Sequence, residues 1–317
     1  MERSVFQAEF DDFECFTEAI DDYDMQITQL VPGHFCGGMQ RISCGSVTIN
    51  SFSATMRVEA LGGPPSGVLT FGIPMQGCES FVWRHLQSDA NTIQIYRPST
   101  ELALMTRSVF GASDVSISES EMNRFCRLWE FPDIDEIIGD REMAVCPGQD
   151  LKHLRSRLHY LCRELAICPQ RLEYDADLQE IVTCEVPALI INALFSSRTG
   201  HLGVKAGARG VLFRKALEYM RETANRRISV GAVCAEVGIG MRSLQREFRQ
   251  YYGMTPKAYL QARRLNDIYR ELRAASPDSA RIIDIASRQG FWHMSQFAFD
   301  YRRLFGELPS VTLNRSR

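Results

Sequence analysis

The sequence lacks the short cysteine and histidine spacings that mark metal sites and redox-active pairs. It contains ten cysteines but no Cys-x-x-Cys pair, and six histidines but no His-x-His pair. Scattered cysteines without such spacing are usually small core residues of proteins that fold in a reducing compartment. We therefore expect no metal site and no cofactor. The cysteines are Cys15, Cys36, Cys44, Cys78, Cys126, Cys146, Cys162, Cys168, Cys184 and Cys234.

Other signals are missing as well. No uninterrupted run of about 18 apolar residues occurs, which is the length that a membrane-spanning helix needs. Residues 1–6 lack the apolar core of a signal peptide, and an acidic stretch follows them. The Gly-x-Ser-x-Gly pattern of hydrolases and the phosphate-binding loop of nucleotidases are absent too. We expect a cytoplasmic protein that neither spans a membrane nor carries these two catalytic motifs.

The charge is divided unevenly along the chain. The 317 residues carry a net charge of only −3, with 45% hydrophobic and 24% charged residues, and this length predicts two domains. Residues 209–317 contain 20 basic and 10 acidic residues, whereas residues 1–208 contain 16 basic and 29 acidic ones. Such asymmetry is typical of a protein in which one domain binds phosphates and the other does not.

One short pattern occurs twice in the basic segment, over residues 233–256 and again over residues 285–309. Each copy predicts a short helix, a turn at a glycine, and a longer helix that ends at a second glycine. This is the arrangement of a helix-turn-helix, whose second helix enters the major groove of DNA. Two such units in one small basic domain indicate a sequence-specific DNA-binding protein.

The second helix of the first copy has two predicted faces. Leu244 and Phe248 are four residues apart, so one face of the helix would bury both. The polar side chains must then lie on other faces, and they are Arg242, Gln245, Arg246 and Arg249.

These polar side chains suit two kinds of DNA contact. Gln245 and Arg246 match base edges, because a carboxamide can bind adenine and a guanidinium can bind guanine with two hydrogen bonds each. Arg249 lies one turn further along, and we expect it to contact phosphate.

The second copy is chemically different. A core face is predicted for Phe297, Tyr301, Leu304 and Phe305, which leaves an outer face with His293, Met294, Ser295, Ala298, Phe299 and Arg302. Phe299 cannot donate a hydrogen bond to a base edge. We therefore expect the first copy to supply more of the base-specific binding energy.

A long helix is predicted between the two copies. Thr255 and Pro256 are good residues for a helix start, since threonine caps the first turn and proline fits within it. The helix should run to about Ala274, and 19 residues at 1.5 Å each give about 28 Å. A spacer of that length can hold two recognition helices about one DNA turn apart. We expect its arginines to lie largely outward, namely Arg263, Arg264, Arg270 and Arg273.

The N-terminal half has the pattern of a small β-barrel or sandwich from about Gln26 to Ser118. Short β-branched and aromatic runs alternate with turn residues, and the clearest strands are predicted at residues 46–52, 67–73 and 92–96. Short helices are predicted at residues 13–20 and 118–128, with Ser118 as the cap of the second. In the basic segment, Ser229 is predicted to cap the helix that runs through Val237.

Two longer amphipathic helices are predicted at about residues 151–196, with a kink or a break at Pro187. They either only cover the barrel or also form a dimer contact. The glycine-rich residues 197–209 are predicted to be a linker. The expected domains are thus a regulatory and dimerisation domain at residues 1–196 and a DNA-binding domain at residues 210–317.

The C-terminal third of the chain resembles the AraC/XylS family of bacterial transcription regulators. The first copy carries this resemblance in Leu244–Phe248 and Gly253–Pro256, and the second in Ile283–Ala286, Gly290–Phe291 and Phe305–Pro309. The resemblance implies an α+β protein, with a cupin-like β-barrel and dimerisation helices before an all-α domain of two helix-turn-helix units joined by a long helix.

The resemblance also implies partners and contacts. The partners would be double-stranded promoter DNA, a small-molecule effector, a second copy of the chain and RNA polymerase, with activation of transcription rather than repression. Base contacts would come from Arg242, Gln245 and Arg246, and from Met294, Ser295 and Gln296. With the residues taken from the helical faces, the predicted DNA-binding set is Arg242, Ser243, Gln245, Arg246, Arg249, His293, Met294, Ser295, Gln296, Ala298 and Arg302.

Three rival functions remain to be weighed. A cupin-type metal oxygenase needs a histidine-rich ligand set, but His34 and His85 stand alone in the barrel region. A DNA-repair methyltransferase with the same DNA-binding fold needs a zinc-binding cysteine cluster, which the spacing does not offer. A regulator without an effector, whose N-terminal domain only dimerises or binds a protein, stays open. Phe71, Phe81 and Trp83 are weak candidates for an effector cavity, because aromatic residues in a small barrel belong to its core far more often.

Overall fold

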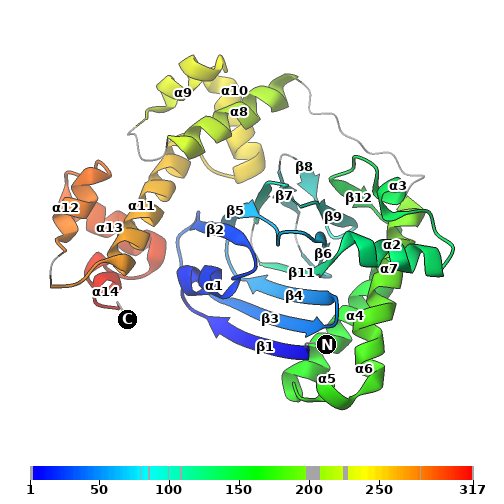
Figure 1. The fold of residues 1–317 in the computed structure, drawn as a ribbon. Helices are drawn as coiled ribbons and strands as arrows, with labels where there is room; N and C mark the ends of the chain where they lie inside the picture. Colours follow the sequence, from blue (N-terminus) through cyan, green and yellow to red (C-terminus); the bar gives the residue numbers. More distant parts are fainter. Residues whose placement is uncertain are drawn as a thin grey trace. The chain divides into compact units, whose positions relative to one another are not determined.

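The computed structural model describes residues 3–78, 80–84, 86–98, 100–107, 109–197, 208–223, 228–278 and 280–315, and the chain forms two compact units (Figure 1). The first unit comprises Met1–Gln26, Cys36–Thr55 and Ala60–Val204. The second comprises Lys205–Arg317 together with two short segments from the N-terminal half, Ile27–Phe35 and Met56–Glu59. Both segments lie within the region of the predicted barrel, and their residues 27–29 and 58–59 are also strand residues of the five-stranded sheet. The predicted linker lies mostly outside the described residues.

The strands form two sheets, and every register that the structure gives is antiparallel. The order in the seven-stranded sheet is β1 (Arg3–Phe10), β3 (Gly37–Cys44), β4 (Val47–Ala54), β11 (Phe110–Ile117), β6 (Leu69–Pro74), β9 (Thr92–Tyr96) and β12 (Met143–Val145). The order in the five-stranded sheet is β2 (Asp24–Gln29), β5 (Val58–Gly63), β10 (Leu102–Met105), β7 (Phe81–Trp83) and β8 (Leu86–Ser88). The three strands predicted from the sequence are confirmed as β4, β6 and β9.

Helices follow the strands, as the sequence predicts. In the first unit they are α1 (Phe13–Ala19), α2 (Glu119–Leu128), α3 (Ile134–Ile138), α4 (Gly148–Ile167), α5 (Arg171–Tyr174), α6 (Ala176–Glu180), the π-helical turn η1 (Ile181–Glu185) and α7 (Val186–Ser196). The predicted cap of α2 is confirmed, since the Ser118 side chain accepts a hydrogen bond from the Glu121 amide at 3.3 Å. The mixed α+β class is confirmed as well.

One hydrophobic core joins the seven-stranded sheet to these helices. Ile49 and Val115 of the sheet belong to the same buried cluster as Leu154 of α4 and Ile190 of α7. Figure 1 shows α4 and α7 in green beside the sheet. The predicted stripe of α4 is confirmed because its leucines at 151, 154, 158, 161 and 165 are all fully buried.

Pro187 neither interrupts the core nor ends the helical path. The π-helical turn η1 comes directly before it, and the proline occupies the first turn of α7, where a missing amide hydrogen costs little. Among the described residues, one helical segment, Ala176–Ser196, is long and apolar enough to cross a membrane, judged by length and composition alone. Leu178, Val182 and Ile190 pack into the core, so we interpret this segment as a core helix of the first unit.

A buried carboxyl group lies within the first unit at Asp114 of β11. The Tyr23 hydroxyl donates a 2.7 Å hydrogen bond to its Oδ2. Burial raises the pKa of Asp114 to about 7, against the lowering effect of the Tyr23 hydrogen bond, and the nearby Asp22 charge adds to the rise. The folded protein therefore holds this proton more tightly than the unfolded chain does.

Asp114→Asn is expected to be more stable than the parent protein at high pH, because the variant lacks the buried carboxyl group that must ionise there. Because folded Asp114 binds its proton more tightly, it contributes fully to the free energy of unfolding below about pH 4. That contribution is lost as the pH rises toward 7. The variant should therefore melt like the parent near pH 4 and several degrees above it at pH 8, because a pKa raised from 3.8 to about 7 corresponds to about 4 kcal/mol. Thermal melts at the two pH values test this, with the exposed Asp11→Asn as the matched control. Equal pH dependence in parent and variant would refute the assignment.

The second unit is helical over its C-terminal part. Its helices are α8 (Ala208–Glu222), α9 (Val230–Val237), α10 (Met241–Glu247), the π-helical turn η3 (Phe248–Tyr252), α11 (Pro256–Ala274), α12 (Ile282–Arg288), α13 (Met294–Phe305) and α14 (Pro309–Asn314). The predicted connecting helix is confirmed as α11, whose Thr255 cap accepts a hydrogen bond from the Ala258 amide at 3.2 Å. Two helix pairs, α9–α10 and α12–α13, flank α11 in the sequence.

Candidate nucleic-acid interface

The first helix pair has the turn that a helix-turn-helix requires. Ser229 caps α9 by accepting a hydrogen bond from the Ala232 amide at 3.1 Å, as predicted. The helix ends at Gly238, whose φ of 72° lies in the left-handed region that favours glycine. Only Ile239 and Gly240 separate it from Met241, where α10 begins, so the chain changes direction within a very short turn.

Helix α10 separates a buried face from an exposed one. Leu244 and Phe248 are fully buried, and the Phe248 ring contacts the rings of Phe213, Tyr252 and Tyr259. This apolar anchoring fixes the rotation of the helix about its axis. The predicted polar side chains then lie outward: Ser243 is half-buried, and Arg242, Gln245, Arg246 and Arg249 are exposed.

The second helix pair follows the same design. Helix α12 ends before Gly290, whose φ is 86°, and α13 begins at Met294. The predicted core residues Phe297, Tyr301, Leu304 and Phe305 are all buried. The opposite face is open, with Met294 and Ala298 half-buried and with His293, Ser295, Gln296 and Arg302 exposed. Gln296, which the helical faces alone did not assign outward, is thus also exposed.

Two large aromatic side chains lie at the surface of this second pair. Trp292 is 63% exposed and Phe299 is 61% exposed, which is unusual for rings of this size. The Arg303 guanidinium lies 5.9 Å from the centre of the Phe299 ring, within the range of a cation–π contact. The outward position predicted for Phe299 is confirmed.

The exposed arginines differ in their ion pairs. Arg246 contacts Glu247, its neighbour in the chain, at 2.9 Å, and Arg303 lies 3.6 Å from Asp300. Among the described residues, none forms an ion pair with Arg242, Arg249 or Arg302. The carboxylates of Glu247 and Asp300 are buried, but both arginine side chains are more than half exposed, so a phosphate or a guanine can reach them.

Helix α11 contains the main departure from the sequence-based prediction. Arg263 was expected to face outward, but it is buried, and its Nη1 lies 3.2 Å from the Glu59 Oε2. Arg221 of α8 pairs with the other oxygen of Glu59 at 2.8 Å. The hydroxyls of Tyr252 and Tyr259 each donate a 2.8 Å hydrogen bond to the same carboxylate.

The other N-terminal segment of this unit contacts both α11 and α13. The backbone amide of Gln29 donates to Asn266 Oδ1 of α11 at 2.9 Å, and its side-chain amide donates to the Leu304 carbonyl of α13 at 2.6 Å. No local sequence pattern predicts these contacts, because the partners are more than 200 positions apart. Both N-terminal segments are thus structural parts of the unit that carries the helix pairs.

The weak effector candidates lie in packed interior. Phe71, Phe81 and Trp83 are almost completely buried, and Phe71 belongs to the core between sheet and helices. The Trp83 ring packs on Tyr96 with the ring centres 4.5 Å apart. His34 is exposed, and His85 lies outside the described residues. Over the described part of the chain, no group of three or more His, Cys, Asp or Glu side chains is placed to hold a metal ion.

The segment that contains the two helix pairs is similar in sequence to known proteins. Residues 233–315 match the protein family described as "Helix-turn-helix domain". The chain is similar to the "Probable thc operon regulatory protein" of Rhodococcus erythropolis, with 32% identity over 130 residues, or 41% of this chain and 39% of the relative. It is also similar to the "XylDLEGF operon transcriptional activator" of Pseudomonas putida, with 35% identity over 105 residues, or 33% of each chain.

The chain thus spans less than half the length of either curated relative. Among solved structures, it is similar to that of the AraC-like transcriptional activator CuxR, with 12% identity over 84% of this chain and 96% of the other, at a TM-score of 0.43.

Proposed function

We propose, from the AraC/XylS family to which the C-terminal domain of this chain belongs, that the protein regulates transcription by binding promoter DNA sequence-specifically. The observation that carries the proposal is the pair of helices α10 and α13, each anchored by a buried aromatic face and open on its polar face. Each helix would lie in a major groove, and α11 would set the distance between them.

The side chains divide into two roles in this proposal. Arg242, Gln245 and Arg246 of α10 would read base edges, with Ser243 beside them, while Arg249 would contact phosphate. On the second helix pair, base edges would be contacted by His293, Met294, Ser295, Gln296 and Ala298, and phosphate by Arg302. The excess of basic over acidic residues in residues 209–317 favours the approach of DNA.

The finer parts of the proposal rest on the relatives. The names of several of them include "transcriptional activator", which favours activation over repression and a contact with RNA polymerase. The first unit would bind an effector, form a homodimer, or do both, in the cytoplasm where promoter DNA lies. The alternative is a regulator or repressor whose first unit only dimerises or binds a protein. No enzymatic step is part of the proposal.

A binding-site selection from random duplex DNA with the full chain tests this function. We expect enriched sites with two conserved boxes about 10 base pairs apart, because α11 holds two recognition helices. The box read by α10 should be the stricter one, since α13 presents Phe299 where a base-reading polar group would be needed. Binding without any enriched sequence would refute specific recognition, and a single box would refute the two-groove arrangement.

A further inference from the structure

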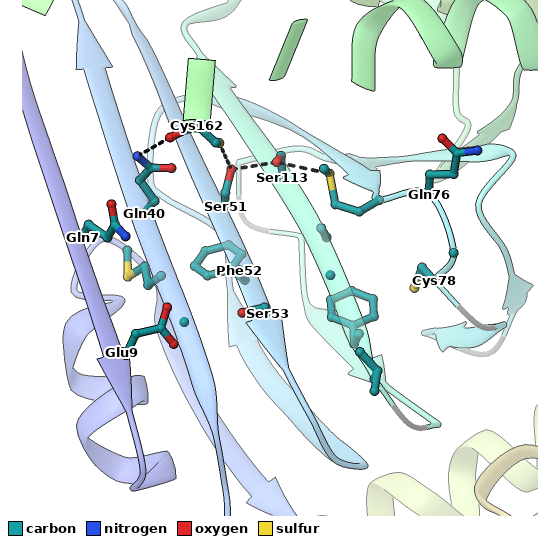
Figure 2. Close-up of a pocket in the computed structure, with 18 residues that line it drawn as sticks. Gln7, Glu9, Gln40, Ser51, Phe52, Ser53, Gln76, Cys78, Ser113 and Cys162 are labelled. Carbon is teal, nitrogen blue, oxygen red and sulfur yellow. Dashed lines mark hydrogen bonds between the residues drawn. The ribbon is translucent and has the colours of Figure 1, made fainter. Parts of the chain in front are cut away.

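A hollow lies on the seven-stranded sheet of the first unit, on the side that the helices cover elsewhere. Its volume is about 420 Å³, which falls in the range of small-molecule sites. Strands β1, β3, β4 and β11, the loop at residues 75–78 and Cys162 of α4 line it. Figure 2 shows these side chains around the opening.

The strand sequences explain why the hollow is there. Alternate residues of a strand share one face, so Val47, Ile49, Ser51 and Ser53 follow one another on this face of β4. The first two belong to the core under the helices, and the two serines line the hollow. The helices therefore cover this face of β4 as far as Ile49. From Ser51 onward the same face carries polar side chains and is not covered by the helices.

The floor combines satisfied polar groups with apolar surface. The Ser51 hydroxyl lies 2.7 Å from the Ser113 hydroxyl and 3.1 Å from the Cys162 sulfur, and Gln40 donates to the Cys162 carbonyl at 3.0 Å (Figure 2). Apolar lining on this face comes from Met75 of the adjoining loop. Because the hydroxyl groups on the floor of the hollow are already hydrogen-bonded, an apolar group can cover them without leaving a buried polar group without a partner.

One end of the hollow carries a negative charge. Glu9 of β1 lines it and is exposed, and no residue in the described ranges pairs with its carboxylate. The Glu9 Oε1 and the Ser53 Oγ converge above Gly38, each 2.9 Å from the point where a Cβ on that glycine would lie. No basic side chain lines the hollow; Arg155 donates instead to the Pro74 carbonyl at 2.7 Å.

We propose that this hollow binds a small amphipathic cation, with a primary ammonium group at Glu9 and Ser53 and a compact apolar group against Met75. The charge-assisted hydrogen bonds from the ammonium would fix its orientation, and the apolar floor would supply contact area. The proposal rests on the proposed function, in which the first unit senses an effector. It places that site in the open hollow on the helix-side face of the sheet, and not among the buried side chains of Phe71, Phe81 and Trp83.

Nuclear magnetic resonance of the full chain with labelled methionine methyl groups tests the proposal, with 2-phenylethylamine as the probe. The chain has 12 methionines, and the resonance of Met75 should shift most at millimolar probe. Phenylacetate should bind about tenfold more weakly because it presents a carboxylate to Glu9.

Two variants and one control sharpen the test. Glu9→Gln should weaken 2-phenylethylamine about five- to tenfold by removing the charge. Gly111→Leu should abolish binding, because a Cβ there meets Met75 at an ordinary contact distance of 3.5 Å and the rest of the side chain fills the hollow. Glu18→Gln, an exposed acid of α1 outside the hollow, should leave the affinity unchanged.

The proposal is overturned if the Met75 resonance does not respond to the amine. It is equally overturned if Gly111→Leu still binds, or if phenylacetate binds as well as the amine. DNA binding, measured on the same samples without any probe, reports separately on the proposed function. A failure of DNA binding therefore cannot be mistaken for a failure of the ligand site.

Discussion

Glu59→Ala is expected to lower the free energy of unfolding of the second unit by about 3–5 kcal/mol, the usual cost of removing one partner from a buried ion pair. Glu59 is fully buried, and its two oxygens receive Arg221 and Arg263 as well as two tyrosine hydroxyls. Burial alone would raise the pKa of Glu59, but the two guanidinium groups hold it below its ordinary value. The carboxylate is therefore ionised at neutral pH, and alanine leaves two buried cations without it.

Hydrogen exchange of the α11 amides in the full chain measures this effect, because it reports on the second unit alone. The matched control is Glu236→Ala on α9, an exposed acid whose removal should change stability by less than about 0.5 kcal/mol. The triple change Glu59→Leu, Arg221→Met and Arg263→Met should recover most of the loss, since it removes the stranded charges together with their partner. Unchanged protection of α11 in Glu59→Ala would contradict the account.

The predictions from sequence succeeded where a structural feature depends on residues close in the chain. Ser229 and Thr255 begin α9 and α11 because a hydroxyl can cap the amides two or three residues later, which is a purely local interaction. The buried faces of α10 and α13 follow from helical spacing in the same way. The surface positions of the candidate DNA-binding residues could be predicted for this reason, with Gln296 supplied by the family resemblance.

The predictions failed where the environment comes from a distant segment. Arg263 looks like any outward arginine on an amphipathic helix until Glu59, 204 positions earlier, is placed beside it. Strand β1 is similar: its acidic and aromatic residues gave no strand signal, yet its eight residues pair in unbroken register with β3. The hollow depends on where α4 stops covering the sheet, which no local pattern reports. Long-range partners of this kind are invisible in a single sequence.

Arg246→Ala is expected to weaken binding to the selected DNA site by about 1–3 kcal/mol, while binding to random DNA falls much less. The physical reason is the geometry of α10. Arg246 lies on the face opposite the buried Leu244 and Phe248, and its side chain is 54% exposed. Its partner Glu247 is buried, but the guanidinium end of the pair is open to solvent, so a guanine edge can reach it.

Arg249→Ala should behave differently although the two arginines are only three positions apart. Arg249 lies on the π-helical turn after α10, beyond the part of the helix that enters the groove, and we assign it to phosphate. Its removal should weaken selected and random DNA alike, and it should lower the slope of log affinity against log salt concentration by about one. Salt titrations of both variants on both DNAs measure the two effects.

The control for both is Arg127→Ala, an exposed arginine of α2 in the first unit, which should change neither affinity nor slope. If Arg246→Ala weakens both DNAs equally, Arg246 is a phosphate contact, and the base-reading face of α10 must lie elsewhere on the helix. If Arg249→Ala changes the sequence preference instead, the π-helical turn itself enters the groove. The recognition surface would then extend beyond α10, because the wider turn moves the side chains after Phe248 to new positions around the axis.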